Sequence, residues 1–171
     1  MGASVWAVVE YKEYDSYFSF AKIDLPRDIE FLCAIAWGDG GYTGDMPFPP
    51  RGFPSDASYP AQESFFVSRD EVKEYLENFD EDTEDETSLE AYARAYGDWA
   101  IKEYKSSGRL PMPELTGYGW LTLAELEANI AQRGLEISTL LPVTRAMLAA
   151  MMELAATYGR DGVRLVFWIS M

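Results

Sequence analysis

The stretch SVWAVVEYK at residues 4–12 decides the fold class. It is rich in β-branched and aromatic residues and apolar on both faces, which predicts a strand in the centre of a sheet. YFSFAKI at 17–23 follows closely and predicts the second strand of a hairpin. VRLVFWI at 163–169 predicts a closing strand, which we expect to pair with the first. The sequence therefore predicts an α+β fold in a single domain, with a small antiparallel sheet covered by about five helices.

Helix signals fill the chain between these strands. RDIEFLCAIAW at 27–37 predicts a short buried helix, with Cys33 as a small core residue. Capping boxes, an initial proline and apolar spacing predict four more helices, at residues 69–79, 88–108, 122–134 and 142–159. In the helix that begins at Ser88, the aromatic residues recur at helical spacing, which favours a place in the core for Tyr92, Tyr96 and Trp99.

The composition excludes several classes of site. The 171 residues include no histidine, which removes Ser-His-Asp triads, imidazole bases and histidine metal sites. The single cysteine cannot form an internal disulfide or a four-thiolate zinc site. The acidic run at 80–86 fails the EF-hand pattern, because Asp85 stands where the loop needs glycine. We therefore expect no enzymatic chemistry, no cofactor and no metal.

The start of the sequence and its uncharged runs indicate where in the cell the protein is located. Residues 1–9 lack the positively charged start of a signal peptide, and the longest uncharged run, at 115–124, is ten residues. A membrane span needs about 20 apolar residues. We expect no membrane association and a location in the cytoplasm of a host cell.

Acidic residues concentrate in one part of the chain. The net charge is −15, and residues 61–105 hold 14 acidic and 5 basic side chains. The helix at 69–79 places Asp70, Glu74 and Glu77 on one outer stripe. The run that follows adds six carboxylates: Asp80, Glu81, Asp82, Glu84, Asp85 and Glu86. These charges predict an acidic helical insertion at about 61–115 within a single domain at 1–171.

This acidic surface suggests a partner. A basic or nucleic-acid-binding surface of a host protein would complement it, whereas direct nucleic-acid binding is opposed by phosphate repulsion. Seven extended residues at 80–86 span roughly 23 Å, so their carboxylates lie about 4 Å apart, close to the 3.4 Å or so per phosphate of a DNA strand. That spacing permits nucleic-acid mimicry. The alternative is a solvated acidic connector.

A second candidate site is the loop at 38–62, which is rich in glycine and proline. A loop of this length inside a compact domain is usually functional or packed by its own side chains. Arg51 is its one basic residue, and with Tyr42 and Phe53 it forms a candidate ligand loop. A structural salt bridge is the alternative role for Arg51.

Three stretches of the chain resemble a known family. They are PPRGFPSDAS at 49–58, GWLTLAEL at 119–126 and VRLVFWIS at 163–170. Together they resemble a loop, a helix start and the closing strand of a family of small, uncharacterised phage and prophage proteins. Tyr118-Gly119 stands where that family has His-Ser, so its polar residues are not kept here. The resemblance implies a phage or mobile-element origin and brings no established activity.

These observations lead to one functional hypothesis. The chain is a non-enzymatic phage or mobile-element accessory protein, and its acidic surface binds and inhibits a host defence or nucleic-acid-handling protein. Two alternatives stay open. One is a protein that sequesters a small molecule or nucleotide through the loop at 38–62. The other is a carboxylate- or metal-dependent enzyme.

Overall fold

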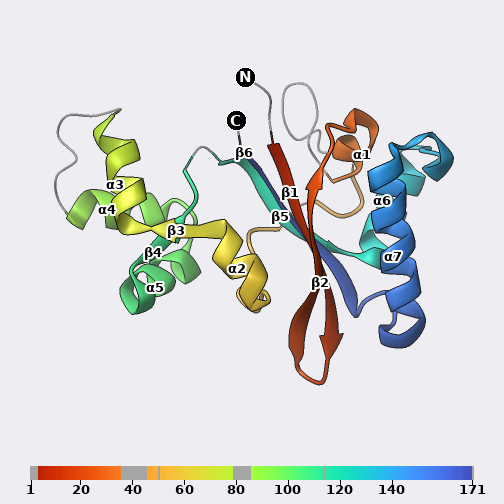
Figure 1. Ribbon diagram of the computed structural model, residues 1–171, viewed down its shortest axis with the longest axis horizontal. Coiled ribbons are helices and arrows are strands. Elements are labelled where there is room, and N and C mark those ends of the chain that lie inside the picture. Colours follow the sequence, from red (N-terminus) through yellow and green to blue (C-terminus); the bar gives the residue numbers. More distant parts are fainter. Residues whose placement is uncertain (1–3, 36–45, 50, 79–85, 114, 171) are drawn as a thin grey trace. The chain divides into compact units, whose positions relative to one another are not determined.

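A computed structural model describes residues 4–35, 46–49, 51–78, 86–113 and 115–170 (Figure 1). The chain divides into two compact units. The first combines Met1–Ala61 with Leu115–Met171, and the second is Gln62–Glu114. The second unit coincides closely with the segment that the charge distribution singled out.

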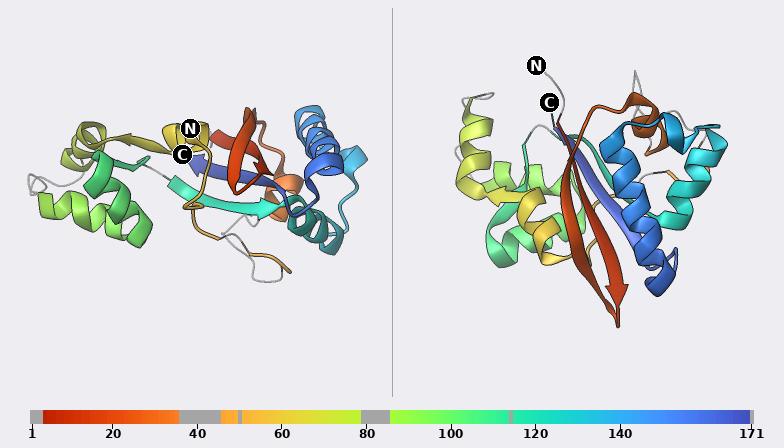
Figure 2. Two further views of the ribbon diagram at one scale, coloured as in Figure 1. Left: turned by 90° about the horizontal axis from the view of Figure 1, so that it is seen from below. Right: turned by 45° about the vertical axis from the view of Figure 1, so that its right-hand side comes forward.

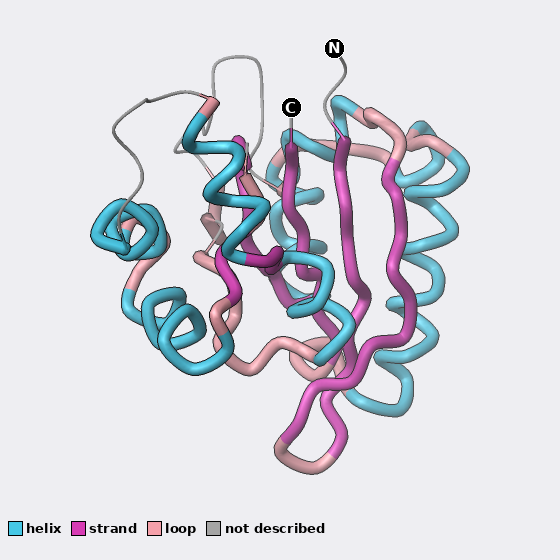
Figure 3. Tube along the Cα trace, turned by 60° about the vertical axis from the view of Figure 1, so that its left-hand side comes forward, coloured by secondary structure: helices cyan, strands magenta, loops and turns pink. Residues whose placement is uncertain are grey.

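The first unit is built on a four-stranded antiparallel sheet in the order β2-β1-β6-β5 (Figure 3). Its strands are β1 (Ser4–Glu13), β2 (Ser16–Leu25), β5 (Leu115–Thr122) and β6 (Val163–Ser170). The predicted α+β class is confirmed, and so is the pairing of the first strand with the last, in which Val8 lies opposite Val166. The sequence did not predict β5, because Gly117 and Gly119 interrupt its apolar pattern.

Helices cover one face of this sheet (Figure 2). They are α1 (Ile29–Ala34), α6 (Leu123–Gln132) and α7 (Pro142–Tyr158), with a short 3-10 helix η1 (Ile137–Thr139) before α7. Side chains alternate along β1, so Val5, Ala7 and Val9 all join the core on this face. From α7, Met147 and Met151 pack into the same core and are at most 2% exposed. Burial of each such side chain stabilises the fold by roughly 1.5–3 kcal/mol.

The described residues of the second unit form four helices and a two-stranded sheet. Its elements are α2 (Tyr59–Phe65), in which the boundary between the units falls, β3 (Phe66–Ser68), α3 (Arg69–Glu77), α4 (Glu86–Arg94), α5 (Asp98–Ser107) and β4 (Arg109–Pro111). Strands β3 and β4 pair antiparallel. The unit has a small core of its own, made of Val72, Leu89, Ala93, Tyr104 and Leu110.

Several predicted elements differ from the structure. The single helix expected at 88–108 is two helices, α4 and α5, because Gly97 adopts a φ of 106° that breaks the chain direction before α5. Tyr92, Tyr96, Trp99 and Cys33, which were expected in the core, are half-buried, and Tyr92 packs against the core of the second unit. Helix α2 begins inside the expected loop at 38–62. The described ranges hold seven α-helices where about five were expected. No helix within those ranges is both long enough and apolar enough to cross a membrane.

Candidate functional site

Helix α3 carries the described part of the predicted acidic surface. Asp70, Glu74 and Glu77 are all exposed, and we call them the α3 acidic stripe. Their position is fixed by Val72, which is fully buried on the opposite side of the helix. The spacing of these side chains therefore presents three carboxylates to solvent, as the sequence predicted.

The start of α3 is set by a capping box at Ser68. The Ser68 side chain accepts a hydrogen bond from the backbone N–H of Glu71 at 3.3 Å. In return, the Ser68 backbone N–H and hydroxyl donate to Glu71 Oε2 at 2.9 and 2.7 Å. These hydrogen bonds from the serine hydroxyl and backbone lower the pKa of Glu71 and keep it charged. An anion here also complements the positive end of the helix dipole.

Most of the α3 acidic stripe is not neutralised by neighbouring cations. Glu77 lies 3.6 Å from Lys73, an exposed pair one helical turn apart. Asp70 and Glu74 make no ion pair with any residue that the structure describes. The stripe therefore keeps a net negative charge that an external cation can meet.

Some predicted site residues lie outside the described part of the chain. These are Tyr42, Asp80, Glu81, Asp82, Glu84 and Asp85. Glu86 is the first residue of α4. The acidic run therefore connects α3 to α4, so it continues from the helix that carries the acidic stripe.

A second cluster of charges lies on the face of the sheet opposite the helices α1, α6 and α7. Glu10 of β1 and Arg164 of β6 are direct partners in the strand register, and Arg164 Nε donates to Glu10 Oε2 at 2.7 Å. Their side chains are 0% and 1% exposed. The other carboxylate oxygen of Glu10 accepts from the backbone N–H of Ser58 at 2.8 Å. This is a buried ion pair with partners on both of its members.

The guanidinium of Arg164 has further partners in the segment that precedes α2. Its Nη1 donates to Asp56 Oδ1 at 2.8 Å and its Nη2 to the backbone oxygen of Asp56 at 3.1 Å. The rings of Tyr17 and Trp120 lie 3.4 and 5.2 Å from its Cζ atom, at the distances of cation–π contacts. Burial raises the pKa of Tyr17, and the positive charge of Arg164 opposes that rise. We use the name Arg164 cluster for five residues: Glu10, Tyr17, Asp56, Trp120 and Arg164.

Arg51 extends this cluster to the edge of the sheet. Its backbone forms a bridge with Trp120 of β5, and its Cζ atom lies 3.6 Å from the centre of the Trp120 ring. Its Nη2 pairs with Glu125 Oε2. Glu125 also accepts from the Thr122 backbone N–H at 2.9 Å, which completes the capping box of α6. Arg51 makes the salt bridge that was one of its two predicted roles, and its side chain is still 42% exposed.

The chemistry of the Arg164 cluster is structural. Arg164 is buried and its hydrogen bonds go to Glu10 and Asp56, so the cluster holds residues 51–58 against the sheet. Phe53 is 4% exposed and contributes its ring to packing. The three stretches 49–58, 119–126 and 163–170 meet here through the contacts of Arg51, Asp56, Trp120 and Arg164.

One sequence signal indicates this cluster. Glu10 is the only charged residue among the first seven of β1, and Arg164 is the only one in β6. Opposite charges in two apolar strands that are expected to pair indicate a cross-strand ion pair. In the described part of the chain, no group of three or more acidic or cysteine side chains is arranged to hold a metal ion.

No family model, no curated protein and no solved structure matches this chain. Its function is therefore inferred from its own charges and contacts.

Proposed function

We propose that the chain is a non-enzymatic accessory protein of a phage or other mobile element, which binds and inhibits a host protein through its acidic second unit. The partner has a basic surface, of the kind that defence proteins and other nucleic-acid-handling proteins use to hold phosphates. The observation that carries the proposal is the α3 acidic stripe, exposed and only partly paired. The phage origin rests on the resemblance at 49–58, 119–126 and 163–170.

The stability of the protein does not account for this charge. Like charges repel one another and destabilise the compact state. The hydrophobic core of the second unit and the capping box of α3 need neither Asp70 nor Glu74. A concentration of unpaired carboxylates is useful in association, because complementary potentials steer the encounter of two proteins.

The spacing of the carboxylates in the α3 acidic stripe can be compared with the spacing of phosphates in a nucleic acid. Along a helix that rises 1.5 Å per residue, Asp70 and Glu74 lie about 6 Å apart and Glu74 and Glu77 about 4.5 Å apart along the axis. A DNA strand carries a phosphate every 3.4 Å or so along its axis. The helix alone is therefore sparser in charge than DNA, and nucleic-acid mimicry also needs the run at 80–86. Binding to a basic protein surface does not require that density.

Capture from a bacterial lysate tests the proposal. The bait proteins are the parent and a variant with the substitutions Asp70→Asn, Glu74→Gln and Glu77→Gln. A matched control neutralises three exposed carboxylates of the first unit, Glu13, Asp24 and Glu153, and so has the same net charge. We expect the parent and the control to retain a partner that the α3 variant loses, and the parent to inhibit that partner's activity.

Equal capture by all three proteins would contradict the proposal. It would show that binding does not depend on the α3 acidic stripe. Capture by the parent alone would show that only the net charge matters, which also contradicts a specific surface. Each capture is repeated at low and moderate salt, because screening shortens the reach of exposed charges to about 8–10 Å.

A second candidate function is the sequestration of a small anion by Arg51. The supporting observation is that Arg51 is 42% exposed while it stacks on Trp120. A specific ligand raises the apparent stability of the protein by mass action. Thermal shift with nucleotides, for the parent and for Arg51→Gln, distinguishes the two functions, because the acidic surface predicts no shift that depends on Arg51.

A further inference from the structure

We propose that a hollow beside α5 in the second unit binds a phosphate-bearing small molecule of nucleotide size. The hollow has a volume of about 510 Å³ and is lined by Arg94, Asp98, Ile101, Lys102, Lys105 and Ser106. Small-molecule sites commonly measure about 300–1,000 Å³. The lining shares no residue with the α3 acidic stripe or the Arg164 cluster, and the inference does not rest on the proposed function.

The first argument is the distribution of cations. Residues 62–114 contain six basic side chains, although the segment as a whole is strongly acidic. A neighbouring hollow of about 430 Å³ shares Lys105 and adds Arg69. Four of the six cations thus line two adjoining hollows: Arg69, Arg94, Lys102 and Lys105. The other two, Lys73 and Arg109, pair with acidic neighbours.

The second argument is that the cations of this hollow outnumber their partners. Arg94 Nη2 and Lys105 Nζ both contact the same oxygen, Glu90 Oε1, at 2.9 and 3.2 Å. Lys102 makes no ion pair within the described part of the chain. The Glu90 carboxylate therefore pairs with two cations, and a third cation, Lys102, is left to bind a ligand. Asp98 also lines the hollow, but it lies in the first turn of α5, where its charge complements the helix dipole.

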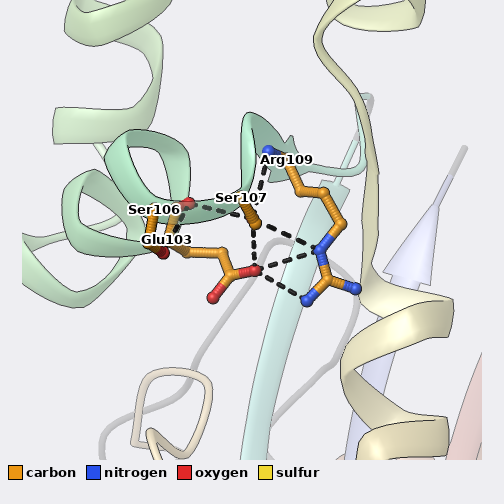
Figure 4. Close-up of polar contacts among 4 residues, drawn as sticks. All are labelled: Glu103, Ser106, Ser107 and Arg109. Carbon is orange, nitrogen blue, oxygen red and sulfur yellow. Dashed lines mark hydrogen bonds and ion pairs between the residues drawn. The ribbon is translucent and has the colours of Figure 1, made fainter.

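The third argument is that the end of α5 is held in place (Figure 4). Arg109 donates to Glu103 Oε1 through Nε at 3.0 Å and through Nη2 at 2.6 Å. The Ser107 hydroxyl donates to the same oxygen at 2.6 Å. This network fixes the last turn of the helix, which carries Lys105 and Ser106. A preorganised site loses less entropy when it binds a ligand.

The lining indicates the class of ligand. Lys102 can donate a charge-assisted hydrogen bond to a phosphate group, and Arg94 and Lys105, which share the single carboxylate of Glu90, add positive charge beside it. The remaining wall is largely apolar, formed by Ile101 and the stems of the two lysines, which can pack against a planar or apolar group. A nucleotide combines these two parts. Free phosphate would satisfy only the first of them.

Isothermal titration calorimetry with ADP, inorganic phosphate and adenosine tests the assignment. We expect ADP to bind, phosphate to bind more weakly and adenosine not to bind. Loss of one cation near a bound phosphate should weaken ADP binding about fivefold or more, so Lys102→Gln should show that loss. Lys102 is exposed, and the variant should keep its fold, which circular dichroism checks.

Lys73→Gln is the matched control, because it removes one positive charge from the same unit outside the hollow. We expect it to bind ADP as the parent does. Three results would overturn the site: no binding of ADP by the parent, equal binding by Lys102→Gln and the parent, or equal weakening in both variants. None of these results affects the α3 acidic stripe, so this inference and the proposed function fail separately.

Discussion

Replacement of Arg164 by methionine should destabilise the first unit strongly. The substitution keeps an unbranched side chain of similar length and removes the guanidinium. It leaves Glu10, which is 0% exposed, as a buried carboxylate without its cation. It also removes the hydrogen bonds to Asp56 and the stacking on Tyr17. Loss of one member of a buried ion pair costs about 3–5 kcal/mol, and we expect a decrease in the free energy of unfolding in that range.

A second substitution separates the cost of the unpaired Glu10 charge from the cost of the lost Arg164 contacts. Glu10→Gln removes the unpaired charge and keeps an oxygen that can accept the Ser58 N–H. In the double variant, the penalty of an unpaired buried charge is absent. The double variant should therefore be destabilised less than the sum of the two single variants, with a coupling energy of at least about 1 kcal/mol.

Urea unfolding followed by tryptophan fluorescence measures these free energies. Trp6, Trp120 and Trp168 all belong to the sheet of the first unit and report on its unfolding. Limited proteolysis within residues 51–58 gives an independent readout, because Arg164 holds that segment through Asp56. If Arg164→Met costs less than about 1 kcal/mol, or if the two substitutions add without coupling, the Arg164 cluster does not stabilise the fold as described.

Two further predictions concern single positions. Gly162→Ala should lower the free energy of unfolding by more than about 1 kcal/mol, because the added Cβ overlaps the carbonyl oxygen of Tyr158. Gly52→Ala places its Cβ in open space and should leave the free energy of unfolding nearly unchanged. Thermal unfolding of the two variants measures the difference. The hydroxyl of Tyr92 donates to the backbone oxygen of Pro111 at 3.1 Å, so Tyr92→Phe should lower the free energy of unfolding by about 0.5–1.5 kcal/mol at pH 7. Burial raises the pKa of Tyr92 above its ordinary 10.0, so above pH 10 the hydroxyl loses its proton in the unfolded chain before it does so in the folded protein. The stabilisation that Tyr92 provides is therefore complete below pH 10 and decreases above it. Urea unfolding should show the difference between parent and variant narrowing above pH 10, and a constant difference would contradict this.

The sequence was sufficient to predict the sheet's centre. Apolar residues on both faces of residues 4–12 and 163–169 mark strands buried on both sides, and these form β1 and β6. It was insufficient for β5, where Gly117 and Gly119 contribute no side chains to an alternating pattern. In β5 the pairing with β6 decides the conformation, and pairing between distant segments is not visible in a local pattern.

Of the candidate sites, one could likewise be predicted from a local sequence pattern, and the other depends on how distant residues come together. The α3 acidic stripe follows from helical periodicity, so its exposure could be predicted. The cations of the hollow beside α5 could not be grouped in advance. Arg94 and Lys105 lie on different helices, and the break at Gly97 that brings them to one carboxylate contradicts the single helix that the aromatic spacing predicted.

The most direct test of the proposed function is the rate at which the chain associates with its captured partner as ionic strength changes. The variants compared are the α3 variant, the matched control of the first unit and a variant neutralised at Asp80, Glu81, Asp82, Glu84, Asp85 and Glu86. Stopped-flow measurement should show association slowed about tenfold at low salt in both acidic-unit variants, with a weaker dependence on salt. The matched control should associate as the parent does. Equal rates for all four proteins would contradict the claim that the acidic second unit recognises the partner.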